Sequence, residues 1–531
     1  MARTRRGIIG DDGALDELNN VTCQNQKDIE LVLFTTCLDR LNEKGLLLQC
    51  QCTSGVHIDR LTIDSREVGP SDCFVALRGS KVDGHLFIDK AVKNGATAIV
   101  SEAGPESATD GRLAGPDFAH VKNAHEALAE LASLLQNDPA EHLRVVATTG
   151  TNGKTTVATL IEYVLNHTGH KTGFIGTTGY RFGEQTKSAS HTTPSAIQFY
   201  ELLSEMRNDG CLSCSMEASS HAIDQSRFRT SDVNVAIFTN LSRDHLDYHT
   251  SLEAYGEAKK RLFDRLSPGA IAITNQDDFW GPKMVEHTKA RVVTYGKAQN
   301  AHIRYAIRSN ELSGLELELD GVTAKYRLAG NFNAENLAAA YAGLLSLGLD
   351  ANETRKALQS CPPVEGRMQT LLFNAGTTVI VDYAHTPDAL QNVLQSVRAS
   401  LHAGSHLWCL FGCGGDRDTG KRPEMGLIAE ACSDHVIVTS DNPRSEAPQS
   451  ILEDIKKGMN HPEKAIWQVD RRRAIQEAAK RMAPGDTLVL AGKGHETVQV
   501  IGTQNHHFDD REEATAAFSS DSTHNRLASK A

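Results

Sequence analysis

A glycine-rich loop at residues 150–156, with the sequence GTNGKTT, constrains the fold of this chain more than any other segment. It follows the apolar residues 143–146 and opens a segment in which apolar side chains recur at helical spacing. Between a strand and a helix, such a loop closes backbone N–H groups around phosphate oxygens, its lysine adds positive charge, and its threonine can ligate magnesium. Position 148 is Thr where the usual motif has its first glycine, so a tight structural turn is the alternative. The sequence predicts a nucleotide-binding site whose loop contacts are Gly150, Thr151, Asn152, Gly153, Lys154, Thr155 and Thr156.

The length and composition are those of a folded protein with more than one domain. A chain of 531 residues divides into about three or four domains, each able to bury its own core. Hydrophobic residues make up 40% of the chain and charged residues 23%, which is ordinary for a soluble globular protein and excludes overall disorder. The net charge of -12 gives no support for a nucleic-acid surface, although it is compatible with local cationic pockets for anionic substrates.

The cysteines and the N-terminal region indicate the cellular compartment. Eleven scattered cysteines in so long a chain do not resemble a disulfide framework. We interpret the lone CxxC of Cys211 and Cys214 as buried thiols rather than a zinc or redox site, and Cys50 and Cys52 in the same way. Acidic residues stand where a signal peptide needs an apolar stretch, and no run approaches the roughly 18 apolar residues of a membrane span. We therefore expect a cytoplasmic protein without a membrane span.

Strand-like apolar runs alternate with helical segments between two polar ends. Residues 1–30 and 513–531 are rich in small and polar residues and lack periodicity, so we expect mobile tails there. The alternation between them predicts α/β domains with largely parallel sheets. The predicted strands are 97–100, 145–149, 233–239, 379–383, 407–411, 436–439 and 487–490.

Four of these strands end in polar or glycine-rich loops, at residues 382–385, 412–417, 441–444 and 492–496. Ligands of open parallel sheets bind beyond the carboxyl ends of the strands, so these loops predict a binding edge on the last domain. A domain boundary is expected at Pro362-Pro363, and another near residue 120 after a loop rich in Gly, Pro, Ser and Asp. The predicted domains are 31–120, 121–362 and 363–512.

A carboxylate and an imidazole follow two strands of the middle domain. Glu217 lies in MEASSH and His245 in NLSRDH, and both side chains near a triphosphate suggest magnesium sites. Magnesium prefers oxygen ligands, so Glu217 is the stronger candidate. On chemistry alone, His245 can equally be a structural histidine, and Asp247 and His249 can be solvated loop residues.

Ordered sequence blocks across residues 60–513 resemble the Mur ligases, in particular the branch that adds the third residue of the muramoyl peptide. The blocks are TGTNGKTT, HTTPSA, MEASSHAIDQSRF, FTNLSRDHLDYH, AYGEAK, GNFNAEN, EGRM, DYAHTPDAL, GCGGDRDTGKRP, DNPRSE and GKGHE. The resemblance implies a small N-terminal α/β domain that binds the UDP-muramoyl substrate, a central P-loop ATPase domain with a mostly parallel sheet, and a C-terminal Rossmann-like domain that binds the amino acid. It also implies a monomer that uses ATP and Mg²⁺ to convert a D-glutamyl carboxylate into an acyl phosphate, which an amine attacks.

The resemblance assigns the catalytic and metal-binding residues. Beside Lys154 of the loop, Thr155 and Glu217 match the ligands of one magnesium ion. His245 and Lys259 match the ligands of a second, with Lys259 carbamylated by carbon dioxide into an anion. Without the resemblance, Lys259 and Lys260 would be interpreted as a solvated helix face.

The resemblance also assigns the substrate-binding residues. The nucleotide contacts outside the loop are expected at Asn333, Asn336, Arg367, Asp382, Tyr383 and His385, with structural roles left open for Tyr383 and His385. The uridine-diphosphate pocket matches Ser65, Ser80, Lys81 and Val82. The positions that hold the muramoyl peptide match Thr192, Thr193, Ser219, Gln225 and Arg227, where the arginine would pair with an anionic group.

Arg444 in DNPR points to the amino acid that is added. Diaminopimelate differs from lysine by a second carboxylate, which a guanidinium binds through two parallel hydrogen bonds. By resemblance, the pocket also contains Arg417, Asp441, Asn442, Pro443, Gly492 and Glu496, with Glu496 receiving the substrate ammonium. The alternative for Arg444 is a surface charge after a Pro turn.

The resemblance predicts a ligase that adds meso-diaminopimelate to UDP-N-acetylmuramoyl-L-alanyl-D-glutamate. The alternatives are a lysine-adding Mur ligase, a folylpolyglutamate synthetase and a non-catalytic scaffold of the same fold. DNPR opposes the first and the muramoyl-side blocks oppose the second. The set of Lys154, Glu217, His245, Lys259 and Arg444 opposes the third, because a scaffold has no need for all of them.

Overall fold

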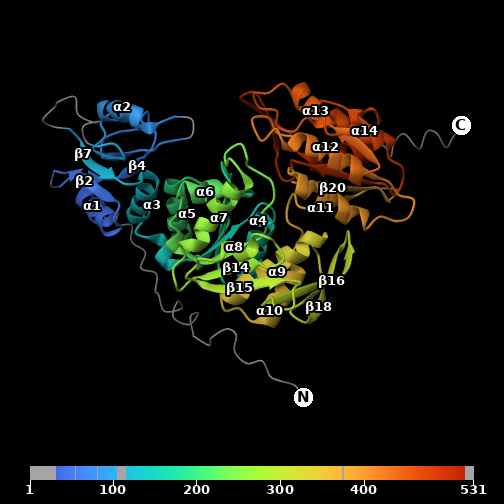
Figure 1. Ribbon diagram of the computed structural model, residues 1–531, viewed down its shortest axis with the longest axis horizontal. Helices are drawn as coiled ribbons and strands as arrows, with labels where there is room; N and C mark the ends of the chain where they lie inside the picture. The colour runs from blue at the N-terminus through green and yellow to red at the C-terminus, as the bar shows by residue number, and fades with distance from the viewer. Residues whose placement is uncertain (1–31, 54, 80–81, 105–114, 374–375, 521–531) are drawn as a thin grey trace, which may run out of the picture.

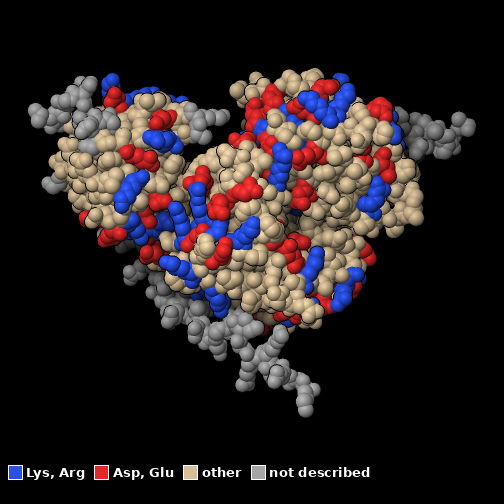
Figure 2. All heavy atoms as spheres, viewed as in Figure 1, with Lys and Arg blue, Asp and Glu red and all other residues tan. Residues whose placement is uncertain are grey.

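The computed structural model describes residues 32–53, 55–79, 82–104, 115–373 and 376–520, and these form three α/β domains in chain order (Figure 1). The central domain lies between the other two and contacts both. Figure 2 shows a wide notch between the N-terminal and C-terminal domains, with the central domain below it. The tail predicted at residues 1–30 lies outside the described residues.

The N-terminal domain is built on a five-stranded sheet in the order β2-β7-β6-β5-β4. Strands β4 (Arg60–Thr62), β5 (Asp72–Ala76), β6 (Ala98–Ser101) and β7 (Asp117–Val121) are parallel, and β2 (Leu47–Gln51) pairs antiparallel with β7. Helix α1 (Phe34–Glu43) buries one of its own faces through side chains at helical spacing, namely Phe34, Cys37, Leu38 and Leu41. The remaining elements are η2 (Gly84–Phe87), α2 (Ile88–Lys93) and the short antiparallel pair β1 (Val32–Leu33) and β3 (His57–Ile58).

The central domain contains an eleven-stranded sheet in the order β11-β10-β9-β12-β8-β13-β14-β15-β16-β17-β18. Its middle, from β9 to β16, is parallel, and hairpin strands extend both ends. The strands are β8 (Arg144–Thr149), β9 (Thr172–Gly176), β10 (Gly179–Phe182), β11 (Gln185–Lys187), β12 (Ser213–Glu217), β13 (Val233–Phe238), β14 (Ile271–Asn275), β15 (Arg291–Gly296), β16 (Ile303–Glu311), β17 (Gly314–Leu319) and β18 (Val322–Tyr326).

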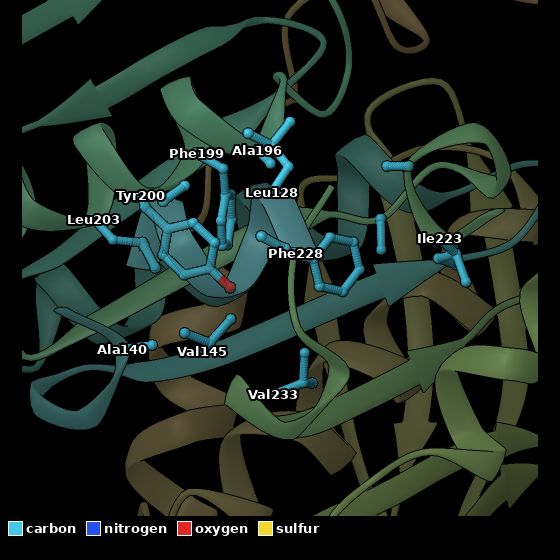
Figure 3. Packing of buried hydrophobic residues seen from close by; sticks show 14 of the residues in the cluster. Leu128, Ala140, Val145, Ala196, Phe199, Tyr200, Leu203, Ile223, Phe228 and Val233 are labelled. Atoms are coloured by element: carbon cyan, nitrogen blue, oxygen red, sulfur yellow. The ribbon is translucent and has the colours of Figure 1, made fainter. Parts of the chain in front are cut away.

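Helices cover both faces of the central sheet. On one face, α4 (Lys154–His167) and α9 (Asn331–Ser346) bury a shared core that includes the predicted apolar stripe Val157, Leu160, Ile161, Val164 and Leu165. On the other face, Leu128 of α3 packs with Phe199, Tyr200 and Leu203 of α5 over Val145 (Figure 3). The remaining helices are α3 (Ala124–Leu135), η4 (Pro139–His142), α5 (Ala196–Asn208), α6 (Ser220–Asp224), η5 (Thr230–Asp232), α7 (Leu252–Asp264), α8 (Gly281–Met284) and α10 (Ala351–Ser360).

The C-terminal domain has a six-stranded sheet in the order β19-β20-β24-β21-β22-β23, parallel except for β19. Its strands are β19 (Gln369–Leu372), β20 (Thr378–Asp382), β21 (Leu407–Phe411), β22 (His435–Val438), β23 (Ile466–Trp467) and β24 (Thr487–Ala491), with a hairpin of β25 (Val498–Ile501) and β26 (Gln504–His507). Its helices are α11 (Pro387–Arg398), α12 (Lys421–Cys432), α13 (Pro448–Lys456), η7 (Pro462–Lys464), α14 (Arg471–Arg481) and α15 (Asp510–Ser520). The expected three-domain α/β fold and all seven predicted strands are confirmed.

Two sequence-based expectations, one about the C-terminal segment and one about two cysteines, are wrong. The tail predicted at residues 513–531 is helical over residues 513–520, because Asp510 forms a fully buried ion pair of 2.7 Å with Arg471 and Ala514 joins the core, and residues 521–531 lie outside the described residues. Cys50 lies on the edge strand β2 and Cys52 just beyond its end, so both are exposed, whereas Cys211 and Cys214 are buried as predicted. The cysteines that the structure describes are free thiols. No helix among the described residues is long and apolar enough to cross a bilayer.

Candidate active site at the domain junction

The phosphate loop joins the carboxyl end of β8 to α4, and only glycine fits at two of its positions. Gly150 has φ +149° and Gly153 has φ +85°. A Cβ atom on Gly150 would lie 1.9 Å from Thr239 Oγ1, and one on Gly153 would lie 2.3 Å from Asn336 Oδ1. Lys154 Nζ folds back and donates to the carbonyl oxygens of Gly150 at 2.9 Å and Thr151 at 2.8 Å. This compact cradle, with a partly buried cation at a helix N-terminus, fits a chain of phosphates.

Glu217 at the end of β12 faces the start of α4. Its carboxylate accepts hydrogen bonds from Thr155 Oγ1 at 3.0 Å, Thr177 Oγ1 at 3.1 Å and Thr177 N at 2.7 Å, and the side chain is fully buried. The parallel register of β12 with β8 pairs Glu217 with Thr148, two residues before the loop. A hydroxyl and a carboxylate side by side are the hard oxygen donors that magnesium prefers.

Lys259 on α7 is buried against the same loop, with 1% of its surface exposed. Its Nζ donates to Gly150 O at 3.0 Å and lies 4.5 Å from the centre of the Tyr255 ring. Burial, and then the nearby charge of Lys154, lower the pKa of Lys259 well below its ordinary value. Lys260 is also buried, so the interpretation of these lysines as a solvated helix face is wrong; the helical pattern alone does not reveal that α7 packs against the loop.

The loop after β13 places His245 and Asp244 between the central and C-terminal domains. His245 has a left-handed backbone at φ +54°, and burial lowers its pKa to about 3. The Asp244 carboxylate lies 3.4 Å from His245 Nε2, 3.8 Å from His385 Nε2 and 4.0 Å from Lys421 Nζ. His249 is buried with Nε2 3.0 Å from Ser220 Oγ, so its interpretation as a solvated residue is wrong, whereas Asp247 is exposed.

Residues of the C-terminal domain and of α9 close the nucleotide side of this site. Arg367 donates from Nη2 to Thr155 Oγ1 at 2.9 Å and lies 4.3 Å over the Tyr383 ring. The Asp382 carboxylate accepts from the backbone N–H groups of Met368 at 2.7 Å and Ala384 at 2.8 Å, so it shapes the loops around it. Asn336 donates to Asn333 Oδ1 at 2.9 Å, and Asn333 lies behind it.

These side chains line one pocket of about 380 Å³. It brings together most of the predicted catalytic and nucleotide residues, although Gly150 is not on its wall and Asn333 lines a neighbouring cavity instead. The predicted residues on its wall are Thr151, Asn152, Gly153, Lys154, Thr155, Thr156, Thr192, Glu217, Ser219, His245, Lys259, Asn336, Arg367, Asp382, Tyr383 and His385. Thr177, Asp244, Tyr255 and Asp388 also line it and were missed by the sequence analysis, although three of them lie inside the blocks quoted for the resemblance.

Asp388 at the start of α11 ties the C-terminal domain to the phosphate loop. Its Oδ2 accepts from Asn152 Nδ2 at 2.8 Å and from Ser242 Oγ at 3.4 Å. Arg243 extends this contact, donating to Glu424 Oε1 at 2.7 Å and to Asp418 Oδ2 at 3.4 Å. The two domains therefore meet directly over the nucleotide pocket.

A second cavity, of about 930 Å³, lies between the N-terminal and central domains. Ser65, Val82 and Gln225 line it, whereas Ser80 and Lys81 lie outside the described residues. Arg227 lies beside this cavity, where it donates to Gln225 Oε1 at 3.1 Å and to the carbonyl oxygen of the buried Thr193 at 2.8 Å. Other residues of its wall are Asp64, Arg66, Lys90, His125, Asp224 and Tyr248.

The loops predicted to bind the amino acid lie together at the carboxyl ends of β22 and β24. Asn442 Nδ2 donates to Glu496 Oε2 at 2.8 Å, and Arg444 Nη1 donates to Gly415 O at 2.8 Å. Arg417 is exposed, and it flanks Gly414 together with Arg444. Lys493, which the sequence analysis missed, is fully buried among Asp441, Asn442 and Glu496.

No group of three or more His, Cys, Asp or Glu side chains among the described residues is arranged to hold a metal ion. Magnesium usually takes one or two protein ligands and fills its shell with water and substrate phosphates. The pair of Thr155 and Glu217 beside the phosphate cradle fits an ion held in that way.

Comparisons with known proteins identify the same family in all three parts of the chain. Three family models match: the Mur ligase family catalytic domain at residues 57–136, the Mur ligase middle domain at 148–344 and the Mur ligase glutamate ligase domain at 366–494. The UDP-N-acetylmuramoyl-L-alanyl-D-glutamate–2,6-diaminopimelate ligases of Cytophaga hutchinsonii and Parabacteroides distasonis are 40% and 42% identical over 470 and 466 residues. They cover 88% and 87% of this chain, and 96% and 95% of their own lengths are matched.

Solved structures of Mur ligases align with this chain over most of its length. A structure of a ligase with that name aligns with a TM-score of 0.64 at 32% identity, covering 93% of this chain and 99% of its own. A MurF from Acinetobacter baumannii, at 19% identity and a TM-score of 0.60, covers 87% of this chain and 96% of its own and shares the fold. With three family models in order and relatives at this identity over most of its length, the chain belongs to the Mur ligase family.

Proposed function

We propose that this protein is the ligase that adds meso-diaminopimelate to UDP-N-acetylmuramoyl-L-alanyl-D-glutamate, with ATP as the energy source, in peptidoglycan precursor synthesis. The diaminopimelate ligases to which it is similar carry that activity in their names. The observation that supports it most is the convergence of the phosphate loop, Glu217 and Lys259 of the central domain with Arg367 and Asp388 of the C-terminal domain around one pocket. The monomeric state and the cytoplasmic location stay predictions.

The reaction requires two anions, a carboxylate and the γ-phosphate of ATP, to come into contact. A D-glutamyl carboxylate oxygen forms a bond to the γ-phosphorus while the bond to the ADP oxygen breaks. The amine then bonds to the acyl carbon, phosphate leaves and the nitrogen loses a proton. Lys154, held at the loop by two carbonyl oxygens, supplies positive charge where these anions meet.

Magnesium would be held by Thr155 and Glu217, and at a second position by His245 and Lys259. Bound there, it would neutralise the charge of the phosphate oxygens as bonds exchange. Burial keeps His245 neutral, as a nitrogen ligand must be.

The environment of Lys259 supports carbamylation. Only an uncharged amine attacks carbon dioxide, and burial beside Lys154 favours the uncharged form of Lys259. The amine nitrogen that now donates to Gly150 O would bond to the carbon of carbon dioxide and lose a proton, and an anionic oxygen of the resulting carbamate would be the ligand. No such change is expected at Lys260, which pairs with Asp264 at 2.5 Å.

The amino acid would bind at the loops of Asp441, Arg444 and Glu496. Arg444 presents its guanidinium beside Gly415 and suits the second carboxylate of diaminopimelate, which lysine lacks. Glu496 suits the ammonium group of the same substrate. Gln225 lines the second cavity, where the UDP-linked sugar would extend, and Arg227 donates to it beside that cavity.

Phosphate release from ATP tests this function. The purified protein is supplied with ATP, Mg²⁺, the UDP-linked dipeptide and meso-diaminopimelate, and each component is then left out in turn. Release should require all of them, and lysine should replace diaminopimelate poorly. Equal release with lysine would favour the lysine-adding alternative. Binding of the substrates without any phosphate release would favour the non-catalytic scaffold.

A further inference from the structure

Lys493 is a fully buried lysine in the loop between β24 and β25, with 0% of its surface exposed. A buried ammonium is costly unless it is paired and hydrogen-bonded. Its three N–H donors each have a protein acceptor: Val498 O at 2.6 Å, Asn442 Oδ1 at 3.2 Å and Glu496 Oε2 at 3.2 Å. Because these donors are engaged with the protein, Lys493 acts on its neighbours rather than on a substrate.

The acceptors of Lys493 come from three different segments. Asn442 belongs to the loop after β22, Glu496 to the loop after β24, and Val498 begins the β25–β26 hairpin. The hairpin in turn holds the backbone of the 441–444 loop. Gln499 donates to Asp441 O at 2.7 Å, Val500 N donates to Asn442 Oδ1 at 3.0 Å, and Arg444 N donates to Val500 O at 3.1 Å. Lys493 therefore stands where the segments carrying Asp441, Arg444 and Glu496 meet.

The charges around Lys493 do not cancel. Its Nζ lies 3.2 Å from Glu496 Oε2 and 3.9 Å from Asp441 Oδ1, so one cation faces two carboxylates. Arg471, a second buried cation that interacts electrostatically with Asp441 and Glu496, is paired with Asp510 at 2.7 Å, so these five charged groups sum to one negative charge. Asp441 is buried, and its Oδ1 has no hydrogen-bond partner within the part of the chain that the structure describes. The cluster thus retains one negative charge and one unused acceptor, which an incoming ammonium group would complement.

We propose that Lys493 is a positioning residue for the amino-acid substrate. It fixes Glu496 and Asn442, and the pair of Asp441 and Glu496 keeps one negative charge that the substrate ammonium balances. This rests on the proposed function of the same site. Without Lys493, two buried carboxylates would repel each other and share a proton, since burial and Asp441 already raise the pKa of Glu496. The ammonium would then lose an ionised partner.

A double-mutant cycle with Lys493→Met and Glu496→Gln tests the proposal, with phosphate release measured against each substrate in turn. In Lys493→Met, the KM for diaminopimelate should rise on the order of 10- to 100-fold, the range for losing a charged hydrogen bond, while the KM values for ATP and the UDP-linked dipeptide stay within about twofold. In the Glu496→Gln background, Lys493→Met should add less than about threefold, because the two residues act as a unit. Fully additive effects, or equal increases in all three KM values, would overturn the proposal.

Two further variants separate positioning from general stability. Lys493→Gln keeps a hydrogen-bond donor but no charge, so it should also raise the KM for diaminopimelate selectively, even where Lys493→Met folds poorly. Arg355→Met removes another buried cation, one that donates to Asn352 Oδ1 at 2.6 Å on α10, and should lower thermal stability without a selective KM change. An unaltered chain that releases no phosphate with diaminopimelate would refute the proposed function. An active chain whose Lys493 variants keep the KM for diaminopimelate would refute this inference alone.

Discussion

Replacing Gly153 by alanine should disable the nucleotide site, and Gly169 provides a matched control at the other end of α4. Both glycines have φ +85°, so alanine at either position meets the same backbone strain, roughly 1–2 kcal/mol. They differ in their surroundings. A Cβ atom on Gly169 would have nothing within 4 Å, whereas one on Gly153 would lie 2.3 Å from Asn336 Oδ1 and 3.3 Å from its Cγ.

The expected magnitude follows from this clash. Ordinary contact begins at 3.4 Å, so the loop or Asn336 must move by about 1 Å. Asn336 is buried and hydrogen-bonded to Asn333, so the loop is expected to give way. A misplacement of about 1 Å in a catalytic site costs on the order of 100-fold in rate, or about 2.7 kcal/mol of transition-state stabilisation.

Phosphate release at varied ATP, with the other substrates saturating, measures the effect. The kcat/KM for ATP should fall about 100-fold in Gly153→Ala and less than about threefold in Gly169→Ala, because only the first change displaces the loop. Thermal unfolding should show a loss from backbone strain in both variants and a larger loss in Gly153→Ala, because the clash with Asn336 adds to that strain. A Gly153→Ala protein within about threefold of the Gly169→Ala protein would refute the geometry of the phosphate cradle.

Three other expectations concern separate residues. Lys259→Ala should abolish turnover, and short carboxylates such as acetate should restore part of it by replacing the carbamate; full activity without them would contradict a metal-binding role. Arg444→Met should lower kcat/KM for diaminopimelate about 10- to 100-fold and leave the weak activity with lysine unchanged, and an equal loss with both amino acids would contradict it. Burial lowers the pKa of His221 to about 4, so its neutral form stabilises the fold above pH 6.5 and this stability is lost as the pH falls toward 4. In urea unfolding, the deficit of His221→Asn relative to the unaltered chain should therefore shrink from pH 7 to pH 4.5, and a constant deficit would contradict the assignment.

Local patterns predicted the parts of the fold that depend on local spacing. The phosphate loop and the buried stripe of α4 follow from residues a few positions apart, and the strands from continuous apolar runs. The polar segment after residue 512 was misjudged because its helix depends on contacts with α14, which lie about 40 residues away in the chain. Cys50 and Cys52 were misjudged because the position of β2 at the sheet edge is a property of the topology.

The candidate site was predictable mainly through resemblance. Glu217 was accessible from chemistry alone, because a carboxylate after a strand suits magnesium. Lys259 was not, since the helix pattern does not reveal which face packs against a loop more than 100 residues away in the chain. Asp388 and Lys493 were missed because their roles depend on contacts between domains and between loops, and neither contact leaves a periodic signal.

The most direct test of the central claim, that the protein activates a D-glutamyl carboxylate by phosphorylation before an amine attacks it, is to follow oxygen. The UDP-linked dipeptide is prepared with ¹⁸O in its D-glutamyl carboxylates and incubated with the protein, ATP, Mg²⁺ and meso-diaminopimelate. Phosphate released in the reaction should carry one ¹⁸O atom for each amide bond formed, because the carboxylate oxygen that attacks the γ-phosphorus leaves with it. Amide formation accompanied by unlabelled phosphate would contradict the account.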